Sequence, residues 1–196
     1  MSDDCEITGF SPKQIARWPH VHKRLCGTLE LPLIDAVSEE VILNIGEGIE
    51  SMLKTEGPSQ KQLKARHGLF KHLKRTIEHR FKNAELQQFG SSQSGLTLQA
   101  GDLDLCLQFK GEVPSKALRQ VNRLLKQHDM EDIVMLPRAK VPIIKFKDER
   151  TKIPVDISIN NTLALHNTEL LKRYSACDDR IRSIILAVKH LSLIHI

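Results

Sequence analysis

Two stretches of the chain alternate strictly between apolar and polar residues, and they constrain the fold more than any other feature. In residues 102–109 every second position is Leu or Phe, and in residues 153–160 every second position is Ile or Val. Successive side chains of a β-strand point to opposite faces. The pattern therefore predicts two strands, each with one face buried against a core and one face that carries polar groups.

The rest of the chain predicts mostly helices. Residues 34–53 and 59–81 carry apolar residues at three- and four-residue spacing, as in amphipathic helices. Gly57-Pro58 ends the first helix, and Ser59 with Gln62 forms a capping box that begins the second. Its predicted apolar stripe is Leu63, Phe70, Leu73, Ile77 and Phe81. Further helices are predicted at 114–128, 162–174 and 178–190, and further strands at 86–89, 133–136 and 141–146.

Composition and charge narrow the class of protein. The chain of 196 residues is 40% hydrophobic and 27% charged, which excludes collagen-like, mucin-like and wholly disordered chains. Its net charge is +5, but residues 61–82 alone carry +7, including Lys71, Lys74 and Arg75. Such a basic segment indicates a polyanionic partner, and a merely solvated helix face is the alternative.

Targeting features are lacking in the sequence. No run of eighteen apolar residues predicts a membrane helix, and the acidic first residues lack the apolar core of a secretory signal. The four cysteines are far apart, which fits a reducing compartment better than a disulfide framework. We therefore expect a cytoplasmic protein, with the nucleus as the alternative, and no membrane partner.

Three aspartates form the candidate chemical site. Asp102 and Asp104 lie two residues apart on one predicted strand, so their carboxylates share a face, and Asp156 has the matching position on the other alternating strand. If the two strands are neighbours in one mixed sheet, the three carboxylates converge. Hard divalent cations prefer such oxygen ligands, and phosphoryl transfer by two metal ions needs this arrangement. For an isolated Asp-x-Asp, a turn or surface strand is the usual alternative.

A glycine–serine turn precedes these aspartates. Gly90 and Ser91 follow a short predicted strand and open a serine-rich stretch that can start a helix. Glycine allows the backbone to come close to a phosphate, and a serine hydroxyl at a helix start can bond a phosphate oxygen. On its own the pair indicates only a turn.

An ordered set of motifs resembles a known family. The segments are Phe89–Leu96, Gly101–Cys106, Val141–Phe146, Val155–Asn161 and Leu163–Thr168, followed by Leu170-Leu171, Tyr174, Asp179-Arg180 and Val188–His190. Over about residues 58–190 they are similar to terminal RNA uridylyltransferases and their cytoplasmic poly(A) polymerase relatives, within the DNA polymerase beta-like nucleotidyltransferases. Gly101 is a departure, because the family usually has serine there.

The resemblance implies a fold and a set of roles. The fold would be α+β, with a mixed sheet flanked by helices and the beginning of a helical PAP-associated domain. Asp102 and Asp104 would hold two Mg²⁺ or Mn²⁺ ions, and Asp156 only the ion that activates the RNA 3′-hydroxyl. Gly90 and Ser91 would contact the β- and γ-phosphates of the nucleotide. Asn167 and Thr168 would contact its ribose, and Lys189 would pair with its triphosphate.

The implied activity is template-independent addition of UMP or AMP from UTP or ATP to an RNA 3′ end, with release of pyrophosphate. The stretch Leu163–Thr168 favours UTP. A poly(A) polymerase of the same family, a small-molecule adenylyltransferase and a non-catalytic RNA-binding module are the alternatives. The basic residues Lys71, Lys74 and Arg75 are predicted to follow the RNA backbone.

The predicted domain organisation has five parts. Residues 1–32 are an irregular lead-in, 33–57 a helix that packs on the helical domain, 58–160 the catalytic domain, and 161–190 the incomplete start of the helical domain. Residues 191–196 read like a translated sequencing adapter, so we expect them to be foreign to the protein. The apolar faces of 162–190 should then be incompletely covered.

Overall fold

The computed structural model describes residues 38–113 and 116–194. The predicted lead-in 1–32 and the first predicted helical residues, 33–37, lie outside them. The chain divides into two compact units between Lys54 and Thr55, and everything below concerns the second unit unless α4 is named. Among the described residues, no helix has both the length and the apolar character needed to cross a membrane.

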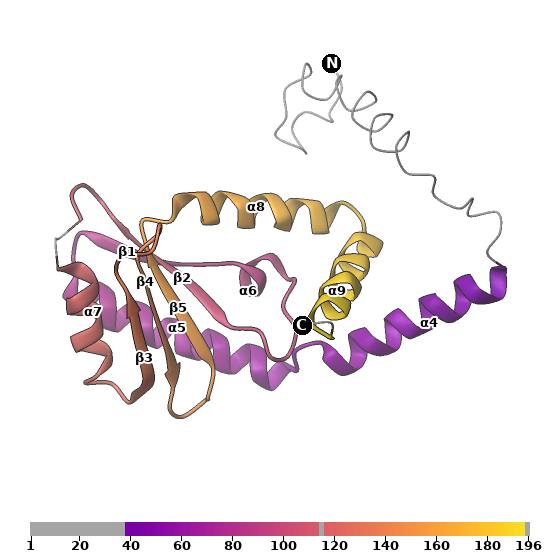
Figure 1. The fold of residues 1–196 in the computed structure, drawn as a ribbon, viewed down its shortest axis with the longest axis horizontal. Helices are drawn as coiled ribbons and strands as arrows, with labels where there is room; N and C mark the ends of the chain where they lie inside the picture. The colour runs from indigo at the N-terminus through magenta and orange to yellow at the C-terminus, as the bar shows by residue number, and fades with distance from the viewer. Residues whose placement is uncertain (1–37, 114–115, 195–196) are drawn as a thin grey trace, which may run out of the picture. The chain divides into compact units, whose positions relative to one another are not determined.

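Helices come at both ends of the described chain, and strands and helices are mixed between them (Figure 1). In order they are α4 (Glu39–Glu56), α5 (Gln60–Arg80), β1 (Ala84–Phe89), α6 (Ser91–Ser94), β2 (Leu103–Phe109), α7 (Ala117–Leu125), β3 (Met130–Leu136), β4 (Ile143–Asp148), β5 (Pro154–Ile159), α8 (Thr162–Cys177) and α9 (Asp179–Ile194).

The strands form one mixed sheet in the order β1-β2-β5-β4-β3. The two alternating segments, β2 and β5, are parallel neighbours, and the other pairs are antiparallel. In the parallel pair Asp104 lies opposite Asp156. The prediction that these strands are adjacent, with Asp156 beside the aspartate pair, is therefore confirmed.

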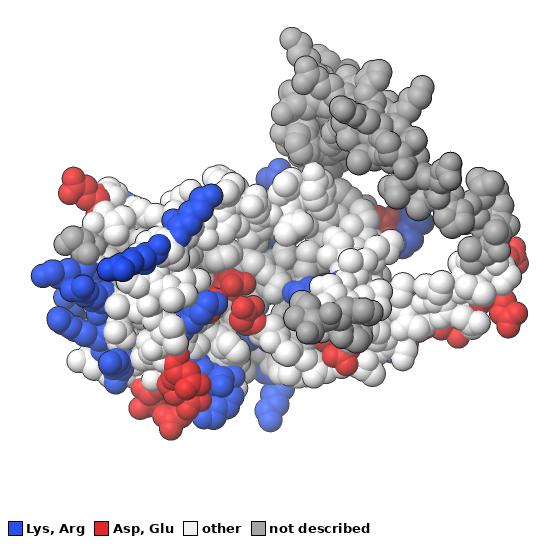
Figure 2. Space-filling view, in the orientation of Figure 1, with Lys and Arg blue, Asp and Glu red and all other residues white. Residues whose placement is uncertain are grey.

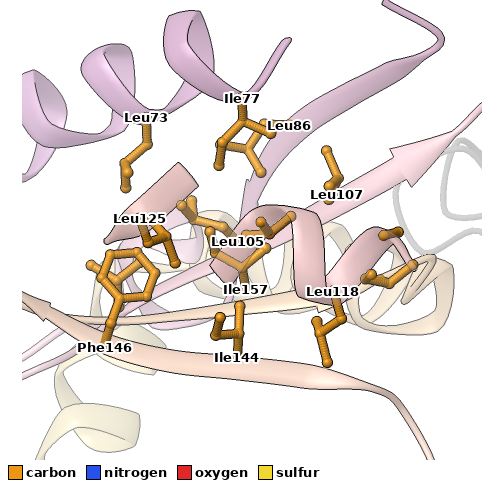
Figure 3. Packing of buried hydrophobic residues seen from close by; sticks show 14 of the residues in the cluster. Leu73, Ile77, Leu86, Leu105, Leu107, Leu118, Leu125, Ile144, Phe146 and Ile157 are labelled. Atoms are coloured by element: carbon orange, nitrogen blue, oxygen red, sulfur yellow. The ribbon is translucent and has the colours of Figure 1, made fainter. Parts of the chain in front are cut away.

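Helices α5 and α7 cover one face of this sheet (Figure 3). Leu73 and Ile77 of α5 and Leu118 and Leu125 of α7 pack against the apolar positions of the strands, among them Leu105. Each such side chain contributes about 1.5–3 kcal/mol when it is fully buried. Because side chains alternate along a strand, the polar positions of β2 and β5 lie on the opposite face, where α6 and α8 pack on β2.

Helix α5 begins as predicted. The Ser59 Oγ accepts a hydrogen bond from the Gln62 amide at 3.3 Å, and the Gln62 Oε1 accepts one from the Ser59 amide at 2.8 Å, which completes the capping box. The predicted apolar stripe was partly wrong. Leu63 lies in the first turn and is 38% exposed, whereas Arg66 and Leu69, which the stripe omitted, are buried.

Other boundaries differ from the prediction by a few residues. The helix expected at 114–128 is the shorter α7, with residues 114–115 outside the described part, and β3 begins at Met130 rather than 133. Helix α9 continues to Ile194, four residues past its predicted end. Helix α4 ends at Glu56, just before Gly57-Pro58 as expected, and none of its side chains is buried. Its packing on a helical domain and the domain boundaries stay predictions.

Candidate active site

Three half-buried carboxylates meet on the polar face of the sheet. One oxygen from each of Asp102, Asp104 and Asp156 lies within 4.8 Å of the other two. The register explains this convergence, because Asp104 and Asp156 are direct partners across the parallel strands and Asp102 comes just before β2 on the same face. The structure thus brings together all three predicted metal ligands, and Figure 2 shows acidic side chains at the surface over the sheet.

The carboxylates disturb one another's ionisation. Burial, followed by the negative charges of Asp102 and Asp156, raises the pKa of Asp104 to about 6, although Lys145 and Lys189 act in the opposite direction. A divalent cation would relieve this repulsion. Three convergent carboxylates are also the oxygen donors that Mg²⁺ or Mn²⁺ prefers. The residues present therefore fit the metal site that the sequence predicts.

Two lysines from different elements bring positive charge to this site. The Lys145 ammonium donates to the Asp156 Oδ2, its direct partner across β4 and β5, and this hydrogen bond raises the pKa of Lys145. Lys189 of α9 donates to the Leu96 carbonyl at 3.2 Å. From the sequence alone, no role of its own is predicted for Lys145. The signal that could have identified the ion pair is the position of Lys145 in its strand, which puts its side chain on the same face as Asp156.

Gly90 lies in direct contact with the Asp104 side chain. Its φ of 74° and ψ of −157° belong to a region that only glycine adopts readily. A Cβ atom at this position would lie 2.2 Å from the Asp104 Oδ2. The Gly90 amide donates to the Thr168 Oγ1 at 2.8 Å, so it is already engaged within the protein, and Ser91 is the first residue of α6.

Four side chains of α8 and α9, seven residues apart, hydrogen-bond the backbone of residues 90–96. The Thr168 hydroxyl accepts from the Gly90 amide, and Ser175 donates to the Ser94 carbonyl. Arg182 donates to the Gly95 carbonyl and Lys189 to the Leu96 carbonyl. We call these four side chains the α8–α9 polar stripe. It connects the glycine–serine turn to both C-terminal helices, and it explains why two of the predicted nucleotide contacts lie beside that turn.

The other residues that were predicted to contact nucleotide or RNA lie in two different places. Asn167 is exposed on α8, next to Thr168. Lys71, Lys74 and Arg75 lie on α5, which covers the face of the sheet opposite the carboxylates, so the structure does not bring them together with the aspartates. The Lys74 ammonium donates to the Leu86 carbonyl at 2.9 Å and pairs with Glu78 at 2.8 Å. A role for these three residues in RNA binding stays a prediction.

Gly101, the departure from the family pattern, has a local explanation. A Cβ atom at Gly101 would lie 2.5 Å from the Thr97 Oγ1 and 3.2 Å from the Leu98 carbonyl oxygen. The Thr97 side chain is buried and its hydroxyl donates to that carbonyl at 3.1 Å. The threonine hydroxyl therefore occupies the space that a serine at position 101 would need.

The sheet order, the in-register aspartates and the adjoining glycine–serine turn are those expected of the polymerase beta-like nucleotidyltransferase fold. Residues 45–176 match the family described as "Poly(A) RNA polymerase, mitochondrial-like, central palm domain", and the chain belongs to this family.

Known proteins of this kind include uridylyltransferases and poly(A) polymerases. Human terminal uridylyltransferase 7 is 36% identical over 143 residues, which are 69% of this chain and 10% of the relative. Poly(A) RNA polymerase cid11 of Schizosaccharomyces pombe is 29% identical over 158 residues, which are 80% of this chain and 33% of the relative. A crystal structure of the Cid1 poly(U) polymerase with MgGTP bound has a TM-score of 0.70 at 32% identity, covering 75% of this chain and 47% of that one.

These matches confirm the family and the α+β fold predicted from the motifs. The chain spans at most a third of the length of the two relatives, and less than half of the Cid1 chain.

Proposed function

We propose that this chain is the catalytic part of an RNA 3′-terminal nucleotidyltransferase, which adds UMP or AMP to an RNA 3′-hydroxyl without a template and releases pyrophosphate. The observation that carries the proposal is the convergence of Asp102, Asp104 and Asp156 in a palm domain of this family. The similar Cid1 has been solved with its short product ApU and with the UTP analogue UMPNPP, which supports RNA and nucleoside triphosphate as substrates.

The three aspartates would hold Mg²⁺ or Mn²⁺. When bound, such an ion lowers the pKa of an attacking hydroxyl and neutralises charge that develops on the phosphate. Gly90 leaves room for the Asp104 carboxylate, because any side chain at this position would collide with it. Lys189, whose positive charge acts on Asp104, would offset the charge of a triphosphate as a point charge.

The family resemblance implies that Asn167 and Thr168 contact the ribose, and hydrogen-bond counting indicates which role each could take. The Thr168 hydroxyl gives its one proton to the Ala164 carbonyl at 2.7 Å and accepts from the Gly90 amide, so one lone pair remains for a ribose hydroxyl. The exposed Asn167 amide offers both a donor and an acceptor. We assign donation to the ribose to Asn167, and to Thr168 the role of acceptor. UTP is the favoured nucleotide because of the stretch Leu163–Thr168, and ATP is the alternative.

A primer-extension assay tests the proposal. A labelled RNA oligonucleotide is incubated with the chain, Mg²⁺ or Mn²⁺ and one nucleoside triphosphate at a time. We expect extension with UTP above all, and at least about a hundredfold loss in the variants Asp102→Ala and Asp104→Ala, because each removes a metal ligand. Circular dichroism shows whether these variants stay folded.

Each competing function predicts another result. If the extension rates of the two aspartate variants are within about tenfold of the unaltered chain, the activation barrier has changed by no more than about 1.4 kcal/mol. That result would exclude the metal-site assignment. RNA binding without extension under any metal and nucleotide would favour a binding module. Transfer of AMP to small molecules but not to RNA would favour a small-molecule adenylyltransferase.

A further inference from the structure

Arg66 is a buried cation that hydrogen-bonds the turn just before Asp102. It lies on α5, on the covered side of the sheet, and only 5% of its surface is exposed. Its Nη2 donates to the Gln99 carbonyl at 2.9 Å and also to the Gly101 carbonyl. The Nε and Nη1 atoms are buried and have no hydrogen-bond partner among the described residues. A guanidinium in such a place is costly, since a buried charge loses its hydration.

The turn that Arg66 contacts leads straight into the first metal ligand. The Gly101 amide closes the turn by donating to the Leu98 carbonyl at 3.1 Å, and Asp102 follows at once. The turn is held at two further points. The Gln99 amide donates to the Glu56 carbonyl at 2.9 Å, and the Ser92 Oγ donates to the Asp102 carbonyl at 3.0 Å.

Electrostatics connects the same residues. Burial lowers the pKa of Arg66, whereas the negative charge of Asp102 acts to raise it. The guanidinium nonetheless stays charged at any physiological pH. Arg66 therefore places a fixed positive charge close to Asp102, and it is far less exposed than Lys145, whose side chain is 49% exposed.

We propose that Arg66 is a positioning residue for the metal site, which holds Asp102 in place by donating from one nitrogen to both ends of the turn at residues 99–101. The inference rests on the proposed function, because it assumes that Asp102 binds a divalent cation. It predicts that a substitution of Arg66 weakens metal binding while the protein stays folded. The effect would be indirect, because Arg66 contacts neither the metal nor the substrate.

The test is titration of the 196-residue chain with Mn²⁺, with free Mn²⁺ followed by electron paramagnetic resonance in the absence of RNA and nucleotide. Arg66→Met should bind Mn²⁺ at least about tenfold more weakly, as is typical when a group that orients a metal ligand is lost. Arg66→Lys keeps the charge without the planar guanidinium, and we expect a loss of about threefold to tenfold.

Leu73→Ala is the matched control. It removes a fully buried side chain two turns along the same helix and lowers stability without touching the turn. We expect its Mn²⁺ affinity to stay within about twofold of the unaltered chain at a temperature where all variants are folded. A similar weakening in Leu73→Ala would mean that Arg66 acts only through stability, and would overturn the inference.

Two further outcomes separate this inference from the proposed function. Arg66→Met with unchanged Mn²⁺ affinity overturns the role of Arg66, and if that variant does not fold, unchanged affinity of Arg66→Lys does so instead. Asp102→Asn with unchanged Mn²⁺ affinity would instead overturn the metal site itself, whatever the Arg66 variants show.

Discussion

Gly90 and Gly95 have nearly the same φ, 74° and 77°, but very different surroundings, and this makes them a natural pair for experiment. A Cβ at Gly90 would collide with Asp104, whereas a Cβ at Gly95 would meet no atom within 4 Å. Gly95→Ala should lose about 1–2 kcal/mol of stability from its left-handed backbone. Gly90→Ala should lose more, because its combination of φ and ψ is one that only glycine adopts readily. Only Gly90→Ala should also weaken Mn²⁺ binding, by about tenfold or more, because it displaces a metal ligand.

Measurement of thermal unfolding and of Mn²⁺ affinity for the two variants decides this prediction. Equal metal affinity in Gly90→Ala and Gly95→Ala would show that the contact with Asp104 does not hold that carboxylate in its binding position.

The pKa of Asp104 predicts an unusual dependence of stability on pH. The unfolded carboxyl titrates near its ordinary value of 3.8 and the folded one at about 6, so between these values the folded state holds more protons. The contribution of Asp104 to the free energy of unfolding is therefore greatest below pH 4, falls as the pH rises through this window, and is constant above it. Metal-free protein is required, because a bound cation would keep the carboxylate ionised.

Asp104→Asn isolates this contribution, since its amide mimics the neutral acid at every pH. The difference in Tm between Asp104→Asn and the unaltered chain, both with a chelator, should increase in favour of the asparagine variant from about pH 4 to 6 and then level off. A difference that stays constant over that range would contradict the raised pKa.

At the scale of single elements, the start of α5 can be tested directly. Ser59→Ala removes the capping hydrogen bond and should cost about 1 kcal/mol, a decrease in Tm of about 2–4 °C for a domain of this size. Ser38→Ala is the control, because the Ser38 Oγ accepts from the Val41 amide at 3.4 Å at the start of α4, which buries no side chain. We expect the main thermal transition to stay unchanged in that variant, and equal shifts in both would contradict the prediction.

Local sequence patterns predicted the helices and strands well. The burial of individual side chains was predicted less well, because it depends on tertiary packing. The alternation in β2 and β5 and the capping box of α5 depend on neighbouring residues, so the sequence was sufficient for them. Leu63 was placed in the core by spacing alone, although only packing against other elements determines whether a helical position is covered. Such packing decides the burial of Arg66 as well.

The same distinction applies to the candidate site. The three aspartates could be predicted because they share a face of strands whose periodicity is visible in the sequence. The ion pair between Lys145 and Asp156 depends on the register of two antiparallel strands, and a shift of one residue would place the lysine on the other face. The α8–α9 polar stripe requires the docking of two helices on a turn some eighty residues earlier in the chain, which no local pattern encodes.

For the whole molecule, α8 and α9 expose large apolar side chains, as α4 does with Val41, Ile42, Leu43 and Ile45. Leu163 is 69% and Val188 60% exposed, and Leu171 and Ile184 are exposed as well, as expected for incompletely covered faces. Apolar patches of this kind promote association. We expect the purified chain to bind 8-anilinonaphthalene-1-sulfonate and to self-associate with rising concentration.

Replacement of both Leu163 and Val188 by Gln should reduce dye fluorescence and association, measured by sedimentation velocity, and change Tm little, because exposed side chains contribute little to stability. Loss of several degrees in Tm would show instead that these side chains stabilise the folded chain.

The position of β5 between β2 and β4 has a consequence for how the protein is made. β5 is the last strand to be synthesised, yet it fills the centre of the sheet. A nascent chain that ends before residue 154 therefore exposes two strand edges, and unpaired edges readily join those of other chains. Each of these edges carries a charged residue, Asp104 on β2 and Lys145 on β4, and such a charge opposes the joining of two identical edges. The residues that form the site in the finished protein would thus protect it while it is still incomplete.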